Sequence, residues 1–198
     1  MEKLSNYVQL CGILAGRPEF SHSGRNEEYY IFPLDTERLS GTVDTINVIA
    51  RKSLLDELEV EEKQRISVVG ELRSFNNKSG VGNKLVITVF AKEICFTDEE
   101  DNNYVMLTGA LCKPANLRKT PMGREICDMM IAANRKYGRS DYLPCIAWGS
   151  VAQTASELIA GDIIQIEGRI QSRNYIKIED GVSVSRTAFE VSVISITI

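Results

Sequence analysis

Aromatic and cationic side chains gather along the C-terminal half of the chain. Tyr142 and Trp148, the only tryptophan, lie in one strand-like run, Tyr137 precedes that run, and Tyr175 follows it. Flat rings stack on nucleobases and arginines neutralise phosphates, so this combination is typical of sequence-independent binding to a single nucleic-acid strand. The phosphate candidates in the same half are Arg118, Arg135, Arg139, Arg169 and Arg173.

The run from 141 to 150, DYLPCIAWGS, predicts a strand with two apolar faces. Because strand side chains alternate between faces, one face holds Leu143, Cys145 and Ala147. The other face holds Tyr142, Pro144, Ile146 and Trp148. A solvated strand is normally polar on one side. The second face therefore either packs against protein, as core or subunit contact, or meets a flat ligand.

An internal repeat organises the chain. Residues 6–14 read NYVQLCGIL and residues 103–111 read NYVMLTGAL, a shift of 97. Without a gap, the same shift aligns Arg38 with Arg135, Asp44 with Asp141 and Ser53 with Ser150. Such self-similarity indicates a duplicated structural unit. We therefore expect an N-terminal domain over 1–96, an acidic linker over 97–102 and a C-terminal domain over 103–198.

Each copy predicts three strands, a helix and two further strands. The expected early strands cover 7–14, 28–34 and 44–50 in the first copy, and 104–111, 125–133 and 142–148 in the second. The expected helices cover 53–63 and 150–160, with Ser53 and Ser150 as N-caps. This order is that of the OB-fold, a small Greek-key barrel. The predicted fold class is all-β, with two tandem OB-fold barrels and one short helix in each.

The first copy serves as an internal control for the aromatic face. At the positions of Tyr142, Trp148 and Tyr175 it has Thr45, Arg51 and Asn77. Its inner-face residues stay apolar, so the barrel itself does not require the aromatics. The difference favours a ligand or partner on the second copy, and we expect the N-terminal OB-fold to have a degenerate DNA face.

Composition narrows the classes of function. The chain has 43% apolar and 25% charged residues and a net charge of −4. Residues 1–97 hold 12 Lys/Arg against 14 Asp/Glu, 98–102 hold none against four, and 103–198 hold 11 against nine, so the C-terminal half is the basic one. No apolar run approaches the roughly 20 residues of a membrane span. The N-terminus lacks a signal core, which indicates a cytoplasmic protein.

The sequence gives little support for catalysis, metal binding or disulfide formation. The five cysteines sit singly in apolar runs and are expected to be reduced core thiols. His22, the only histidine, is expected in a loop as a solvated residue. We expect no enzymatic activity, no metal and no cofactor.

The second half resembles the bacterial single-stranded DNA-binding protein family. The resemblance rests on NYVMLTGAL, LRKTPMG, IAANRKYGRSDYLPCIAWGS, GDIIQIEGRIQSRNYIKIEDG and FEVSVISI, which span nearly all of 103–196. It implies that Tyr142, Trp148 and Tyr175 stack on bases, that cations near Arg135 and Arg173 contact phosphate, and that the protein serves DNA replication, recombination or repair.

The resemblance also has consequences for assembly. Family members usually bring four barrels together, so a homodimer of this chain would present four OB-folds. Housekeeping members carry an acidic, phenylalanine-tipped tail that recruits replication and repair proteins, whereas this sequence stops at Ile198 and resembles a version without that tail. Two alternatives stay open: a primosome accessory protein that acts mainly through protein contacts, and a structural OB-fold interaction module that does not bind DNA.

Overall fold

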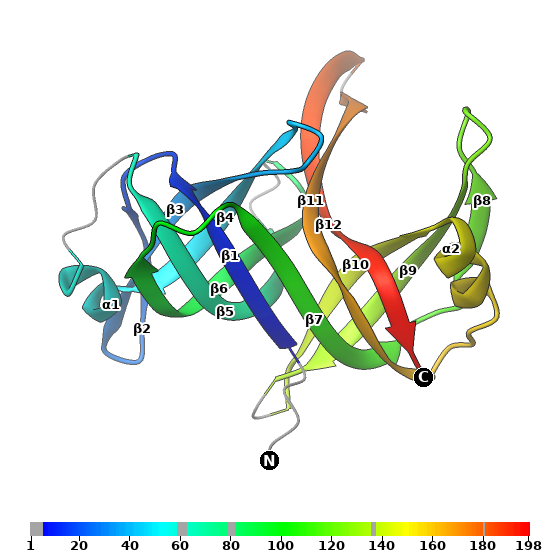
Figure 1. Cartoon of the computed structure of the whole chain (residues 1–198), viewed down its shortest axis with the longest axis horizontal. Helices are drawn as coiled ribbons and strands as arrows, with labels where there is room; N and C mark the ends of the chain where they lie inside the picture. Colours follow the sequence, from blue (N-terminus) through cyan, green and yellow to red (C-terminus); the bar gives the residue numbers. More distant parts are fainter. Residues whose placement is uncertain (1–5, 59–62, 79–81, 136–137, 180) are drawn as a thin grey trace. The chain divides into compact units, whose positions relative to one another are not determined.

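A computed structural model of the chain describes residues 6–58, 63–78, 82–135, 138–179 and 181–198. These residues form two compact units. The N-terminal unit consists of Asn6–Arg73 with Thr88–Val105, and the C-terminal unit consists of Ser74–Ile87 with Met106–Ile198. The C-terminal unit therefore contains a segment of the first sequence repeat together with most of the second. Figure 1 shows the elements coloured along the chain.

The N-terminal unit is a closed barrel. Its strands follow the neighbour order β3-β4-β6-β5-β1, and β1 also pairs with β3, which closes the sheet on itself. The bounds are β1 (Asn6–Leu14), β3 (Glu27–Glu37), β4 (Val43–Arg51), β5 (Arg65–Asn76) and β6 (Leu85–Phe96), with the edge strand β2 (Glu19–Gly24) outside β3 and the helix α1 (Lys52–Asp56) after β4. This is the strand order of an OB-fold.

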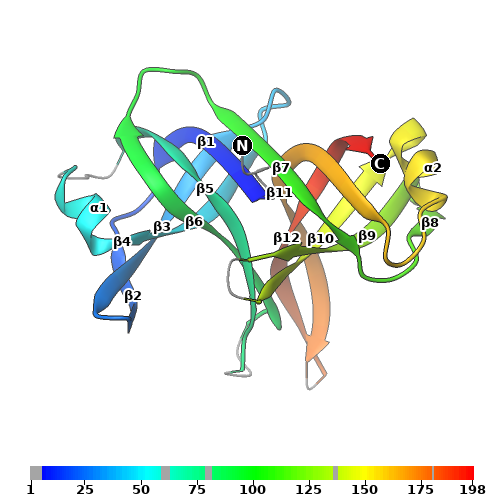
Figure 2. The ribbon, with the colours of Figure 1, turned by 90° about the horizontal axis from the view of Figure 1, so that it is seen from below.

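The C-terminal unit repeats the arrangement. The neighbour order is β7-β11-β12-β10-β9-β8, and β7 also pairs with β9. The bounds are β7 (Asn102–Leu111), β8 (Asn116–Lys119), β9 (Glu125–Asn134), β10 (Ser140–Trp148), α2 (Gly149–Ser156), β11 (Ile163–Glu179) and β12 (Val182–Thr197). Helix α2 packs on β8, β9, β10 and β12 (Figure 2). The predicted tandem OB-fold is confirmed.

A glycine permits each barrel to close. A Cβ atom at Gly12 would lie 2.1 Å from the carbonyl oxygen of Asp35, and one at Gly109 would lie 2.4 Å from that of Ala132. The contact falls where β1, still paired with β5, also meets β3, and where β7 meets β9. The glycine expected to mark a bulge or bend in the first strand of each copy thus allows backbones to approach closely.

Two strands were not expected from the sequence. The edge strands β2 and β8 form hairpins with β3 and β9, in segments predicted as loops, and His22 lies on β2. All side chains of β8, and all of β2 except Gly24, are exposed, so neither strand shows an apolar alternation. The β2–β3 turn uses Arg25 and Asn26 with φ of 54° and 62°, without the Asn-Gly pair typical of such turns.

The predicted serine N-caps are wrong. Helix α1 begins at Lys52 and α2 at Gly149, and their N-caps are Arg51 and Trp148, both extended and without a side-chain capping hydrogen bond. Each strand runs directly into its helix, so the last strand residue occupies the cap position. Ser53 lies inside α1, where its hydroxyl donates to Glu27 Oε1 at 3.0 Å. Residues 59–62 of the expected first helix lie outside the described residues.

Candidate nucleic-acid interface

The outer face of the sheet β9–β10–β12–β11 in the C-terminal unit carries four of the predicted site residues, Tyr142, Trp148, Arg169 and Arg173. Strand register places Tyr142 opposite Ala132 of β9, and Ile146 beside Ser192 of β12. Ser192 in turn faces Arg169 of β11. We call this surface the outer face. It includes Met130, Tyr142, Pro144, Ile146, Trp148, Glu190, Ser192, Arg169, Gln171 and Arg173.

Strand β10 divides its side chains as the alternation predicted. Leu143, Cys145 and Ala147 are buried in the barrel, whereas Tyr142 is 53% exposed and Trp148 is 37% exposed. Burial raises the pKa of the Cys145 thiol far above its ordinary value, so this group stays protonated. The two aromatics lie on one face about 20 Å apart along the strand, at roughly 3.3 Å per residue. Both rings are therefore open to a ligand.

Strands β11 and β12 extend this surface beyond β10 as a long hairpin (Figure 1). The guanidinium of Arg173 lies 5.9 Å from the ring centre of Tyr175, within cation–π range. Arg173 is also 3.7 Å from the carboxylate of Glu190. Tyr175 is half-buried, and its hydroxyl donates to Asn83 Oδ1 at 3.3 Å. The hairpin thus continues the aromatic and cationic chemistry of the outer face.

Phe75 adds an aromatic residue that sequence reasoning missed. The backbone amide of Ser74 donates to Asp141 Oδ1 at 2.6 Å, and the Tyr142 amide donates to Ser74 Oγ at 2.8 Å. These bonds hold the end of β5 against the start of β10. Phe75 follows directly and is 49% exposed. The sequence gives no signal for this placement, because Phe75 lies in the first repeat.

The arginines divide into paired and open side chains. Arg135 donates through Nε to Asp141 at 2.6 Å, and Asp141 is fully buried. Arg38 makes the same pair with the buried Asp44 in the N-terminal unit, at 2.6 Å. Because both units keep this pair, it belongs to the barrel architecture, and the phosphate role predicted for Arg135 must coexist with it.

The other predicted cations differ in their environment. Arg118 pairs with Asp128 at 2.5 Å, and this hydrogen bond raises the pKa of the Arg118 guanidinium. Arg139 and Arg173 are exposed, while the Nε of Arg169 is buried and has no hydrogen-bond partner among the described residues. Tyr137 lies outside the described residues. Arg118, Arg139 and Arg173 are thus the exposed phosphate candidates among the described residues.

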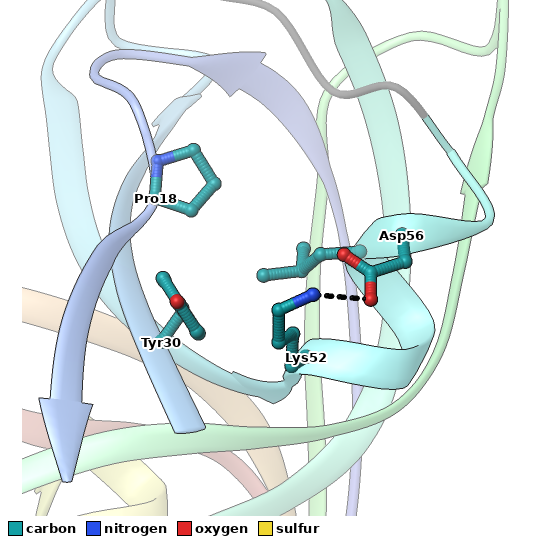
Figure 3. Close-up of a pocket in the computed structure, with 5 residues that line it drawn as sticks. Pro18, Tyr30, Lys52 and Asp56 are labelled. Atoms are coloured by element: carbon teal, nitrogen blue, oxygen red, sulfur yellow. Dashed lines mark hydrogen bonds and ion pairs between the residues drawn. The ribbon is translucent and has the colours of Figure 1, made fainter. Parts of the chain in front are cut away.

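Among the described residues, no cluster of side chains has the composition of a metal site. A shallow pocket of about 180 Å³ in the N-terminal unit is lined by Pro18, Tyr30, Lys52, Leu55 and Asp56 (Figure 3). It is smaller than typical ligand cavities of roughly 300 Å³ or more, and the Lys52–Asp56 ion pair of 2.5 Å spans it.

The five cysteines are free thiols that differ in their burial. Cys11, Cys127 and Cys145 are buried free thiols, as predicted, but Cys95 and Cys112 are exposed, which corrects their assignment to the core. Each lies just past the regular alternation of buried and exposed side chains, Cys95 near the end of β6 and Cys112 directly after β7.

Among the described residues, no helix has the length and apolarity needed to cross a membrane.

Residues 102–197 match the model of the single-strand binding protein family. Single-stranded DNA-binding protein B of Bacillus subtilis is 36% identical over 89 residues, which cover 41% of this chain and 78% of that protein. The chain belongs to the single-strand binding protein family. Single-stranded DNA-binding protein 2 of Listeria innocua is 34% identical over 80 residues, 37% of this chain and 50% of that protein. The chain spans about half the length of most curated single-strand binding proteins that it matches.

The structural comparison extends the likeness to nearly the whole chain. The crystal structure of the wild-type single-stranded DNA binding protein from Thermus aquaticus is similar with a TM-score of 0.79 and 24% identity, covering 97% of this chain and 91% of that one. At this identity the likeness supports the fold. The family resemblance predicted from the motifs of the second repeat is confirmed.

Proposed function

We propose that this single-strand binding family member binds single-stranded DNA without sequence preference, mainly through the outer face of the C-terminal unit. The observation that carries the proposal is the exposure of Tyr142 and Trp148 on β10, on the face that also holds Arg173 of β11. Stacked rings hold bases of any sequence, and cations hold the backbone. The protein acts by binding alone, in the cytoplasm, during DNA replication, recombination or repair.

Assembly is a further part of the proposal. A homodimer presents four OB-folds, and replication or repair proteins are its protein partners. A subunit contact through Tyr142 and Trp148 is the competing use of the same surface. Acrylamide quenching of Trp148 fluorescence distinguishes a DNA-binding surface from a subunit contact when it is measured at protein concentrations above and below those at which the chain assembles. A subunit contact shields the indole only in the oligomer.

Titration with oligo-dT tests the proposal. We expect Trp148 fluorescence to fall as bases stack on the indole, and the affinity to fall as salt rises. For a single strand, the slope of log affinity against log salt is about −0.7 for each phosphate contacted. An unchanged fluorescence at low salt and saturating DNA would contradict the proposal.

Phe75→Ala is expected to weaken oligo-dT binding by roughly 5-fold, the lower end of what one stacked base contributes. The reason is that the hydrogen bonds of Ser74 hold the end of β5, where Phe75 is exposed, against the start of β10. Fluorescence titration of Trp148 measures the change. Phe96→Ala is the matched control, since Phe96 is 48% exposed at the end of β6 in the N-terminal unit. Equal affinities of the two variants would remove Phe75 from the interface.

A further inference from the structure

Ser74, near the end of β5, binds the start of β10 and the loop before it through all three of its polar groups. Its backbone amide donates to Asp141 Oδ1 at 2.6 Å, its carbonyl oxygen accepts a hydrogen bond from Arg135 Nη2 at 3.1 Å, and its hydroxyl oxygen accepts one from the Tyr142 amide at 2.8 Å. Only 8% of Ser74 is exposed, so water competes little for these bonds. We call these three hydrogen bonds the Ser74 clamp.

Strand pairing leaves the start of β10 open on the side of the Ser74 clamp. β10 pairs with β9 from Ser140 to Trp148, whereas its parallel pairing with β12 covers Cys145–Ala147. In an antiparallel ladder, alternate residues turn their amides away from the partner strand. Tyr142 is such a residue, because its amide donates to Ser74. The serine hydroxyl therefore supplies the acceptor that β12 supplies farther along β10.

The Tyr142 ring depends on this backbone for its position. The residue is 53% exposed, so packing of the side chain restrains it little. The preceding residue, Asp141, is fully buried and is held by both Ser74 and Arg135. A surface that is ordered before its ligand arrives avoids the entropy cost of ordering during binding. The Ser74 clamp thus prepares Tyr142 for stacking.

Trp148 provides a contrast at the other end of β10. The preceding residue, Ala147, pairs with β12, and Trp148 itself pairs with β9 and leads directly into α2. Regular secondary structure therefore fixes the backbone of Trp148 without a contribution from β5. Loss of the Ser74 clamp should affect Tyr142 and spare Trp148.

We propose that Ser74 is a positioning residue for Tyr142 in the binding of single-stranded DNA. It holds the backbone of a base-stacking residue and need not touch the DNA itself. The stacking role of Tyr142 rests on the proposed function of the outer face, whereas the hydrogen bonds that hold it do not. Because Ser74 belongs to the first sequence repeat, that repeat contributes to the binding surface of the C-terminal unit.

Ser74→Ala removes the hydroxyl acceptor and leaves the backbone bonds to Asp141 and Arg135 in place. We expect the affinity for a labelled oligo-dT to fall about 3- to 10-fold, the scale of one net hydrogen bond, in an anisotropy titration. Ser74→Thr keeps the hydroxyl and should bind like the parent. Ser156→Ala is the control, because the Ser156 hydroxyl donates to the Gln153 carbonyl at 2.6 Å in α2, outside the outer face.

A double-mutant cycle separates positioning from a general loss of stability. Combined with Tyr142→Ala, Ser74→Ala should cause no further loss of affinity, because the side chain that it positions is gone. Combined with Trp148→Ala, it should lower the affinity by the same factor as in the parent. An equal loss in both backgrounds would overturn the proposal, as would binding by Ser74→Thr as weak as that by Ser74→Ala.

The single variants separate this proposal from the proposed function. If Tyr142→Ala weakens binding but Ser74→Ala binds like the parent, the positioning role is overturned and the proposed function stands. If Tyr142→Ala itself binds like the parent, Tyr142 takes no part in binding and the positioning role is overturned with it. Failure of the parent to bind oligo-dT overturns both.

Discussion

Replacing Trp148 by alanine is expected to weaken oligo-dT binding by about 5- to 150-fold, which corresponds to the 1–3 kcal/mol of one base–aromatic stack. Trp148 ends β10 with a partly exposed ring and caps α2 through its backbone alone. The substitution therefore removes a ligand contact without removing a side-chain cap. Because the variant has no tryptophan, anisotropy of a labelled oligonucleotide measures its affinity.

Two further variants define the meaning of that result. Tyr142→Ala should weaken binding to a similar degree, because Tyr142 is more exposed than Trp148 on the same face. Ile159→Ala should leave the affinity unchanged, since Ile159 is 67% exposed in the loop after α2, outside the outer face. If Trp148→Ala bound as tightly as Ile159→Ala, stacking on β10 would play no part in binding.

Replacing Asp141 by asparagine is expected to cost about 2–4 kcal/mol of unfolding free energy. Asp141 is fully buried, and its carboxylate accepts hydrogen bonds from the Arg135 guanidinium and from the backbone amide of Ser74. Removing one partner of a buried pair leaves the other charge uncompensated. The expected loss of unfolding free energy is smaller than the largest losses known for broken buried ion pairs, because the Arg135 side chain is 26% exposed. Urea unfolding followed by Trp148 fluorescence reports on this unit.

Asp128→Asn is the matched control for that experiment. Asp128 also pairs with an arginine, Arg118, but both side chains are at least 40% exposed, so the loss should stay below about 1 kcal/mol. Asp44→Asn should destabilise the N-terminal unit through the equivalent buried pair, which circular dichroism detects. Similar midpoints for the Asp141 and Asp128 variants would show that burial of the carboxylate contributes nothing.

The two barrels could be predicted from the sequence because both copies of the repeat keep the apolar alternation of the strands and the order of strands and helix. Apolar alternation in β10 follows directly from the side on which the core lies, so Leu143 and Cys145 were assigned to one face and are buried. The OB-fold then followed from the order of strands and helix. The exposure of Tyr142 and Trp148 was predicted by comparing the two copies.

Features without an apolar pattern escaped prediction. Strands β2 and β8 present mainly solvated side chains, so alternation could not reveal them. The helix starts were displaced by one residue because a strand that runs straight into a helix supplies its own extended cap. Serine at 53 and 150 imitates a capping signal that the backbone does not use.

The missed aromatics depend on pairing across strands. Tyr29 and Phe90 of the N-terminal unit, with ring centres 6.0 Å apart, come together only through the registers of β3, β4 and β6. Phe75 comes close to the start of β10 only because the end of β5 belongs to the C-terminal unit. A comparison of one strand with its repeat partner, such as Thr45 with Tyr142, cannot detect either arrangement.

The placement of Ser74–Ile87 in the C-terminal unit has a consequence for the history of the gene. A recombination event that exchanged the DNA encoding residues 103–198 would transfer Asp141 without the Ser74 that binds it. Exchange of that half alone would therefore break this contact, and a substitution at Ser74 would alter the stability of a barrel encoded mostly elsewhere.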